Sequence, residues 1–372
     1  MIYFDSAASY PLLPEVKAEL VNAFDKFYAN SASTHYLGDC ATKEVERVRE
    51  LLADSIGAYP SEVVFTSGAT ESNNIAFKSL LLANDFDSSK KHIITSQIEH
   101  KCVFSICDYL KSCGFEVTYI KPNETGLIEV TDIKKALRSD TALVSIMHVN
   151  NELGTVNPIA EIGELCSNKN ILFHSDAAQS FKKVEIDVDD LNVDVMSFSA
   201  HKIGGPKGIG AIYIRDLRHR HLMPVIHGAG QEDGLRGGTV ATPLISAFAK
   251  AIDCFGKHYD NFKIIDARNY LLESLKRSDI QFVVNGLDSL PSCVSITFPQ
   301  TNTNLLLRAT ETKLCLAQGS ACSSKSIEPS HVLTAIGLTR ELADKTLRIS
   351  FTLNVSNNEI EEFVQAIKKA TE

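Results

Sequence analysis

Apolar positions along the chain fall into short runs that alternate with segments of helical period. The short runs predict strands, and they occupy residues 63–66, 91–95, 117–120, 142–148, 171–174, 193–199 and 210–214. Helix-period segments lie between several of them, at residues 41–56, 72–83 and 159–168. Alternation of this kind predicts βαβ units and a mainly parallel, mixed sheet covered by helices.

The pattern changes after about residue 243. A long amphipathic helix begins there, and strands at 292–298 and 347–351 then give the chain a mixed α+β character. A length of 372 residues is enough for about two domains. We expect a large α/β domain over residues 16–248, and a smaller α+β domain formed by residues 1–15 and 249–372.

Composition and charge exclude several classes of protein. Hydrophobic residues make up 44% and charged residues 22%, which are ordinary globular values, and the net charge of -9 argues against direct nucleic-acid binding. The sequence has no apolar stretch long enough to span a membrane and no secretory signal at its start. We therefore expect a cytoplasmic protein.

The cysteines favour reduced thiols. Nine are present, an odd number, and no C-x-x-C motif occurs, so a disulfide framework is not indicated. Cys102, Cys107 and Cys113 fall in a helical stretch and its following turn, where we interpret them as ordinary core or surface residues.

One predicted strand ends in nucleophilic and basic groups. Residues 193–199 continue into Ala200, His201 and Lys202 and then into a glycine-rich loop. A lysine at a strand end, pointing into a site, is what Schiff-base chemistry with a carbonyl requires. Taken alone, the segment is equally compatible with an ordinary solvated loop lysine.

Two further segments carry groups that a pyridoxal phosphate site needs. Asp176 follows the predicted strand 171–174, and its carboxylate can keep a pyridinium nitrogen protonated, while Gln179 can reach the ring's phenolic oxygen. The turn at residues 67–70 leads into a helix, whose N-terminus attracts a phosphate. Each feature has a plain alternative, since aspartate also caps helices and the turn can be an ordinary βα connection.

Together these segments resemble one family. The motifs TSGATESNN (66–74), MHVNNELG (147–154), DAAQS (176–180) and SAHKIGGPKG (199–208) occur in the order found in the group I, NifS/IscS-like cysteine desulfurases. Those are pyridoxal phosphate enzymes of the class V aminotransferase family. The resemblance covers nearly the whole chain and implies the fold type I of pyridoxal-phosphate-dependent transferases.

The resemblance implies roles for individual residues. Lys202 would bind pyridoxal 5'-phosphate and then act as a base, and His100 would stack on the ring and carry protons. Arg348, with Asn151, would bind the carboxylate of the substrate, L-cysteine. The remaining cofactor contacts implied are Ala69, Thr70, Asn151, Asp176, Gln179, Ser199, His201 and Thr239. Thr239 resembles a residue that reaches the phosphate from the partner subunit, which implies a homodimer.

The segment AQGSACSS (317–324) indicates the reaction. It resembles the active loop of the same enzymes, which implies that Cys322 attacks the substrate sulfur and becomes a persulfide. Residues 30–35 lack the family's usual proline, and residues 351–354 depart from its usual Leu-Gly-Arg, which suggests a specialised member.

Other functions share the fold. A selenocysteine lyase, an aminotransferase or a non-catalytic relative are the alternatives, because one scaffold supports many reactions. The sequence does not identify the protein that accepts the sulfur, and iron–sulfur assembly, tRNA thiolation, cofactor synthesis and DNA phosphorothioation all remain open.

Overall fold

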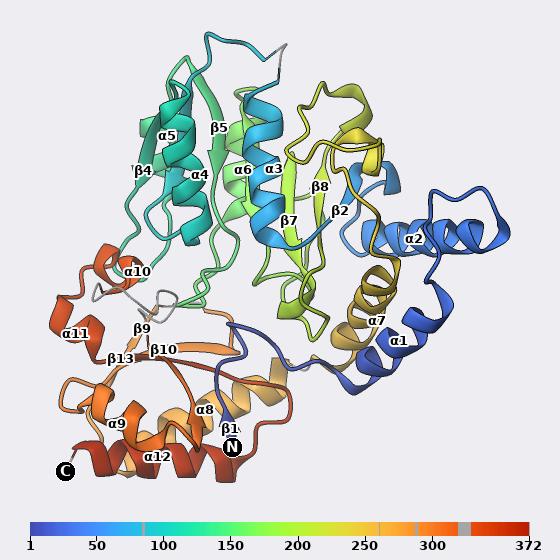
Figure 1. Ribbon diagram of the computed structural model, residues 1–372. Helices are drawn as coiled ribbons and strands as arrows, with labels where there is room; N and C mark the ends of the chain where they lie inside the picture. Colours follow the sequence, from blue (N-terminus) through green and yellow to red (C-terminus); the bar gives the residue numbers. More distant parts are fainter. Residues whose placement is uncertain (84–85, 260, 287–288, 319–328, 372) are drawn as a thin grey trace.

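A seven-stranded mixed sheet lies at the centre of the larger part of the molecule (Figure 1). The computed structural model describes residues 1–83, 86–259, 261–286, 289–318 and 329–371. Strand β8 is antiparallel to both β2 and β7, and the other neighbours are parallel. The sheet follows the order β2 (Val63–Thr66), β8 (Gly210–Ile214), β7 (Val195–Ser199), β6 (Leu172–Asp176), β5 (Thr141–Ser145), β3 (His92–Ser96) and β4 (Glu116–Ile120). The predicted fold class is confirmed.

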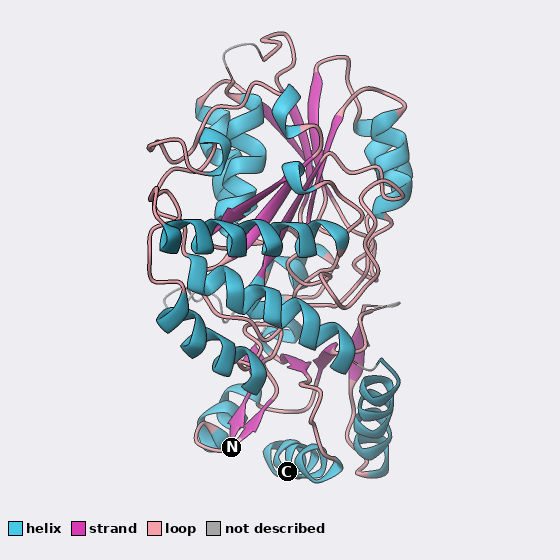
Figure 2. Ribbon diagram, turned by 90° about the vertical axis from the view of Figure 1, so that its right-hand side faces the viewer, coloured by secondary structure: helices cyan, strands magenta, loops and turns pink. Residues whose placement is uncertain are grey.

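Helices cover this sheet on both sides (Figure 2). Adjacent strand residues alternate between two hydrophobic cores, as the period of a strand requires: Val64 and Val195 contribute to one core, whereas Phe65 and Met196 contribute to the other. The helices of this part are α1 (Pro14–Lys26), α2 (Tyr36–Asp54), α3 (Ala69–Leu81), α4 (Lys101–Ser112), α5 (Val130–Ala136), α6 (Ile159–Ser167) and α7 (Thr242–His258).

Helix α2 begins five residues before its predicted start. The side chain of His35 accepts a hydrogen bond from the backbone N–H of Gly38 at 3.2 Å and so caps the helix. A Cβ atom on Gly38 would lie 2.1 Å from the carbonyl oxygen of Ser33. The first turn therefore needs glycine for close packing, and a glycine within a polar stretch gives no helical signal in the sequence.

A second core lies around a smaller sheet. Strands β12 (Ala317–Gln318), β13 (Thr346–Ser350), β10 (Cys293–Thr297) and β9 (Val283–Asn285) pair antiparallel in that order, and β1 (Ile2–Tyr3) pairs with β11 (Leu314–Cys315). This part also contains α8 (Asn261–Arg277), α9 (Thr303–Thr310) and α12 (Asn357–Thr371). Its core includes Ile2 and Phe4 together with residues of α8 and α12. The short helices α10 (His331–Ala335) and α11 (Arg340–Asp344) contribute their buried residues to a core of the larger sheet instead. The domain boundary at residue 248 stays a prediction.

The N-terminal segment connects the two sheets. Asp5 pairs with Ser350 at the small sheet, and the backbone N–H groups of Tyr10 and Leu13 donate to the carbonyls of His201 and Gly204 beyond β7. The segment thereby lies between β13 and the lysine-bearing turn. Over the described residues, no helix has both the length and the apolar character needed to cross a membrane.

Candidate active site

Ten of the twelve predicted site residues line one cavity of about 450 Å³. Nine of them lie at or after the ends of β2, β3, β5, β6 and β7 of the larger sheet, and Arg348 lies in the middle of β13 of the smaller sheet. Ligand sites of α/β proteins commonly form at the carboxyl ends of strands. The ten are Ala69, Thr70, His100, Asn151, Asp176, Gln179, Ser199, His201, Lys202 and Arg348.

Lys202 lies in a short 3₁₀ turn, Ala200–Lys202, directly after β7. Its Nζ atom donates hydrogen bonds to the carbonyl oxygens of Ala7 and Ala8 at 2.7 and 2.8 Å. Gln179 donates from Nε2 to the same Ala7 carbonyl at 2.8 Å. The N-terminal segment therefore holds the amine of Lys202 at the cavity wall, where it can act on a bound molecule.

An anion site forms at the start of α3. Gly68 precedes this 13-residue helix with a φ of 146°, so its backbone adopts a conformation that side-chain-bearing residues rarely take. The turn also packs against β8, because a Cβ atom on Gly210 would lie 2.6 Å from the Cα of Gly68. The first N–H groups of the helix and the Thr70 side chain consequently border the cavity.

The contact between Gly210 and Gly68 gives a first prediction. Gly210→Ala should lower the free energy of unfolding by roughly 1–3 kcal/mol, since neither backbone can move away freely. It should also weaken phosphate binding by displacing the turn. Urea unfolding and titration with pyridoxal phosphate measure the two effects. Gly256→Ala is the matched control, because its new Cβ would meet only the flexible end of Lys182; equal behaviour of the two variants would contradict the prediction.

The carboxylate of Asp176 is held from two sides at the end of β6. Oδ2 accepts from Asn73 Nδ2 at 2.8 Å, and Oδ1 accepts from the backbone N–H of Ala178 at 2.9 Å. Both donors fix the orientation of the carboxyl group. Asp176 is only 5% exposed, so the cavity contains a buried carboxyl group in a fixed orientation.

Two histidines of the site are biased toward their neutral forms. Burial by the surrounding protein lowers the pKa of His100, with Lys202 and Lys101 acting in the same direction and Asp176 opposing them. Burial also lowers the pKa of His201 to about 4, followed by the effect of Lys202. At neutral pH both rings can therefore accept a proton or a hydrogen bond.

Arg348 is positioned by a residue that sequence analysis missed. Its guanidinium is 7% exposed, and it donates from Nη2 to Asp5 Oδ1 at 2.7 Å and from Nη1 to the carbonyl of Asn151 at 2.8 Å. Among the described residues, the buried Nε atom has no hydrogen-bond partner. A planar donor held in this way suits a carboxylate.

The Asp5 contact gives a second prediction. Asp5→Asn should raise the KM for L-cysteine about tenfold, because a charge-assisted hydrogen bond that orients Arg348 becomes a neutral one. The effect on kcat should be smaller, since Asp5 acts on binding. Steady-state alanine production measures both constants, with the exposed Asp25→Asn as control. A KM equal to that of the unchanged protein would refute this role.

Glu99 gives a prediction about pH. The side chain is 1% exposed, and burial raises its pKa to about 8 despite hydrogen bonds from Ser96 and Met147. Because the folded protein holds a proton that the unfolded chain releases above pH 4–5, stability should fall as the pH rises toward 8.

Glu99→Gln removes that titration. From pH 5 to pH 8 the free energy of unfolding should fall in both proteins. The fall should be roughly 2–4 kcal/mol smaller in Glu99→Gln than in the unchanged protein. Urea unfolding at the two pH values gives the comparison, and the exposed Glu164→Gln should behave like the unchanged protein. A parallel loss in both proteins would mean that Glu99 does not titrate in this range.

Comparison with known proteins places the chain in a family. The sequence profile of the class-V aminotransferases matches residues 2–363. A mitosomal cysteine desulfurase of Trachipleistophora hominis is 42% identical, covering 99% of this chain and 86% of that protein. A mitochondrial cysteine desulfurase of Candida maltosa is 41% identical over 99% of this chain and 77% of that protein. A solved structure described as SspA in complex with cysteine is 45% identical with a TM-score of 0.85, covering 94% of this chain and 99% of the other.

The chain belongs to the cysteine desulfurases of the class-V aminotransferase family. Membership implies pyridoxal phosphate as cofactor, and the cavity of this cysteine desulfurase fits that group. An anion site, an oriented carboxylate and a lysine amine line the same space, and these are the three groups that the cofactor requires.

The expected cytoplasmic location is wrong by this comparison. Both curated cysteine desulfurases carry organelle names, a mitosome for one and a mitochondrion for the other. The sequence argument rested on the absence of the apolar stretch that a secretory signal peptide contains. Organelle import uses segments of a different kind, amphipathic and rich in arginine, so that argument does not distinguish the cytoplasm from an organelle.

Two predicted residues of the desulfurase remain. Cys322 falls outside the described residues. Thr239 is exposed and does not line the 450 Å³ cavity. It is adjacent to Val240, at the edge of a second cavity of about 680 Å³ beside α2.

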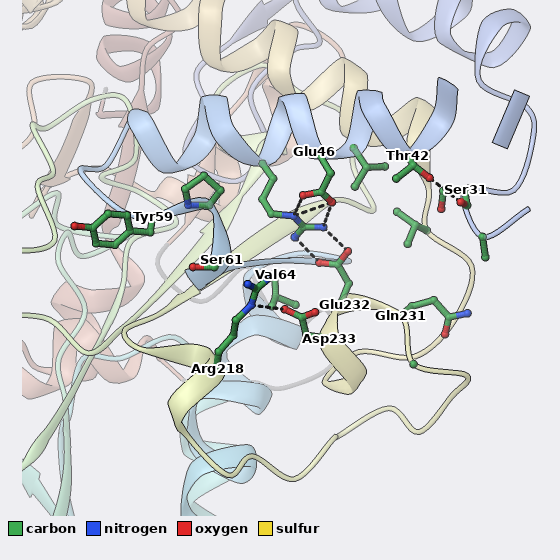
Figure 3. A pocket seen from close by; sticks show the side chains of 16 residues that line it. Ser31, Thr42, Glu46, Tyr59, Ser61, Val64, Arg218, Gln231, Glu232 and Asp233 are labelled. Carbon is green, nitrogen blue, oxygen red and sulfur yellow. Dashed lines mark hydrogen bonds and ion pairs between the residues drawn. The ribbon is translucent and has the colours of Figure 1, made fainter. Parts of the chain in front are cut away.

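That second cavity is dominated by charges that pair with each other (Figure 3). Arg49 contacts Glu232 through two hydrogen bonds, at 2.8 and 2.9 Å, and Glu232 also accepts from the backbone N–H of Phe65 at 2.7 Å. Arg218 lies 3.6 Å from Asp233. Pairs of this kind stabilise the local structure, and none of the predicted site residues that the structure describes lines this cavity.

Proposed function

We propose that this protein removes sulfur from L-cysteine with pyridoxal phosphate, producing L-alanine and a persulfide on Cys322. The observation that carries the proposal is the assembly of Lys202, Asp176 and His100, from three separate strand ends, around one cavity. The SspA structure in complex with cysteine supports the choice of substrate.

Each residue can be given a role from its position. Ala69, Thr70, Ser199 and His201 would hold the phosphate, Asp176 would serve the ring nitrogen, and Gln179 would serve the phenolic oxygen. His100 would cover the ring, and Arg348 with Asn151 would bind the substrate carboxylate. When bound, pyridoxal phosphate supplies an electron sink for charge that develops at the α-carbon.

The chain's own residues then complete the reaction. Lys202 takes a proton from the α-carbon, and a proton is later returned to the carbon that loses sulfur. The Cys322 thiolate attacks the substrate sulfur, so that one S–S bond forms as one C–S bond breaks. No external oxidant is needed for this step. The persulfide then passes to a protein acceptor, for which iron–sulfur assembly, tRNA thiolation and DNA phosphorothioation are alternatives.

The test is a product balance. The purified protein with pyridoxal phosphate, L-cysteine and a thiol reductant should yield alanine and sulfide in equal amounts, because the reductant replaces the acceptor. Production of the keto acid that keeps the sulfur, without alanine or sulfide, would indicate transamination. Strong preference for L-selenocysteine over L-cysteine would instead favour the lyase.

We also infer that the desulfurase works as a homodimer. Thr239 is exposed, away from the cavity of its own chain. Four apolar or aromatic side chains of α1, the α1–α2 connection and α2 are also exposed: Val21, Phe24, Tyr28 and Tyr36. A subunit interface would cover an apolar surface of this kind. Light scattering should give twice the mass of the chain, and Thr239→Ala should bind pyridoxal phosphate more weakly.

A further inference from the structure

Cys102 lies within the candidate active site, where its sulfur contacts the residues around the ring. It belongs to the first turn of α4 and lines the 450 Å³ cavity together with Asn73, His100 and Asp176. Its Sγ atom is 3.0 Å from His100 Nδ1 and 3.3 Å from Asn73 Nδ2. This cysteine is distinct from the proposed nucleophile, and sequence analysis treats it as an ordinary core or surface residue.

The direction of each hydrogen bond follows from the atoms involved. The amide nitrogen of Asn73 has two hydrogens, and it donates to Asp176 Oδ2 at 2.8 Å as well as to Cys102 Sγ. Asn73 is fully buried, so its side chain is fixed by these contacts. The sulfur of Cys102 accepts from Asn73, and its own S–H can be donated to His100 Nδ1 at 3.0 Å.

Cys102 remains a thiol at neutral pH. Burial raises the pKa of Cys102 to about 11, with Asp176 acting in the same direction and hydrogen bonds from Asn73 and Thr70 opposing it. A protonated thiol is a weak donor, whereas a thiolate would be an acceptor. The Nδ1 atom of His100 therefore faces a donor. It faces a second one at 3.3 Å, the backbone N–H of Cys102 itself, because His100 caps α4.

We propose that Cys102 is a positioning residue that fixes His100 as the neutral tautomer with its proton on Nε2. A ring nitrogen that accepts two hydrogen bonds cannot carry a hydrogen of its own. A series of hydrogen bonds thereby connects the carboxylate assigned to the ring nitrogen with the imidazole assigned to cover the ring. It runs from Asp176 through Asn73 and Cys102 to His100. The positioning role of Cys102 rests on the proposed function of His100. The assignment of the His100 tautomer does not, because it follows from the hydrogen bonds alone.

The same contacts oppose protonation of His100. A proton added at Nδ1 would face the S–H and the N–H of Cys102, and Nδ1 could then accept neither hydrogen bond. The charged or titratable groups around the ring are Asp176 on β6, Lys202 after β7, Lys101 on α4 and His331 on α10. None of them changes when Cys102 is replaced, so a shift in the titration of His100 would report on the thiol.

The experiment measures the imidazole nitrogens of the cofactor-loaded protein by NMR after labelling with ¹⁵N-histidine, and His100→Gln assigns the signals. The unchanged protein should show His100 with a hydrogen on Nε2 and none on Nδ1. In Cys102→Ala only the backbone N–H of residue 102 still donates to Nδ1, so we expect a measurable fraction of the Nδ1–H tautomer and an about threefold larger protonated fraction at pH 6, the effect of one weak hydrogen bond. Cys102→Ser keeps a donor and should restore the single tautomer.

Two controls make the result decisive. Cys107→Ala removes a fully buried thiol from the same helix, outside the cavity, and should change stability without changing the His100 signals. The acid limb of the pH profile of alanine production should shift to higher pH in Cys102→Ala and return in Cys102→Ser.

His100 signals in Cys102→Ala identical to those of the unchanged protein would overturn the proposal. Absence of alanine from the unchanged protein would refute the desulfurase function but leave the tautomer measurement valid.

Discussion

Replacing Lys202 with alanine should reduce alanine production from L-cysteine by about 10³-fold or more. Covalent attachment of the cofactor and proton transfer at the α-carbon both need this amine, and proton transfer by a positioned group alone contributes about 10²–10⁴-fold. The amine is held at 2.7–2.8 Å from two carbonyl oxygens of the N-terminal segment, which fixes its position at the cavity. Product assays measure the loss, and borohydride reduction followed by mass spectrometry should locate the cofactor on Lys202 in the unchanged protein.

Lys207→Ala separates this role from a general effect of charge. Lys207 belongs to the same loop and lines the same cavity, but its side chain is exposed and we assign it no covalent role. That variant should still carry the reducible linkage, whereas Lys202→Ala should not. A linkage that persists in Lys202→Ala, in a protein that melts at the normal temperature, would show that another amine binds the cofactor.

The sequence predicts the larger sheet well because its strands are short apolar runs bounded by polar or glycine-containing turns. The strands at residues 63–66 and 210–214 coincide with β2 and β8. The strand expected at 142–148 ends at Ser145, although the backbone N–H groups of Ile146 and His148 still donate to the carbonyls of His174 and Asp176 in the neighbouring strand, β6. Apolar residues continue past the ladder here, and composition alone does not show where pairing stops.

Sequence motifs predict the residues of the site, but they do not predict the contacts that hold those residues in place. Lys202, Asp176 and Thr70 belong to strand-end or turn segments whose residue types fit the chemistry, so each can be found in the sequence. Asp5 and Cys102 could not be found in this way. Asp5 reaches Arg348 across 343 positions of sequence, and the role of Cys102 depends on the orientation of the Asn73 amide. Such contacts arise from packing, which local sequence patterns do not specify.

Replacing Cys322 with alanine should abolish sulfide release and reduce alanine production by about 10³-fold or more, the scale expected for loss of a nucleophile. Cleavage of the C–S bond needs an acceptor for the departing sulfur, and a thiolate is the side chain suited to form an S–S bond with it. L-Cysteine should still bind and change the cofactor absorbance, because Lys202 and Arg348 are intact. Binding without turnover therefore distinguishes loss of the nucleophile from collapse of the site.

The persulfide itself gives the complementary measurement. After L-cysteine is added without reductant, mass spectrometry of alkylated peptides should find one additional sulfur atom on the Cys322 peptide. The exposed Cys113→Ala variant should retain both the persulfide and its turnover. If Cys322→Ala produced alanine at the normal rate, sulfur would leave without a protein thiol, as a selenocysteine-lyase-like mechanism requires. The persulfide route would then be wrong, although the cofactor site around Lys202 and Asp176 would stand.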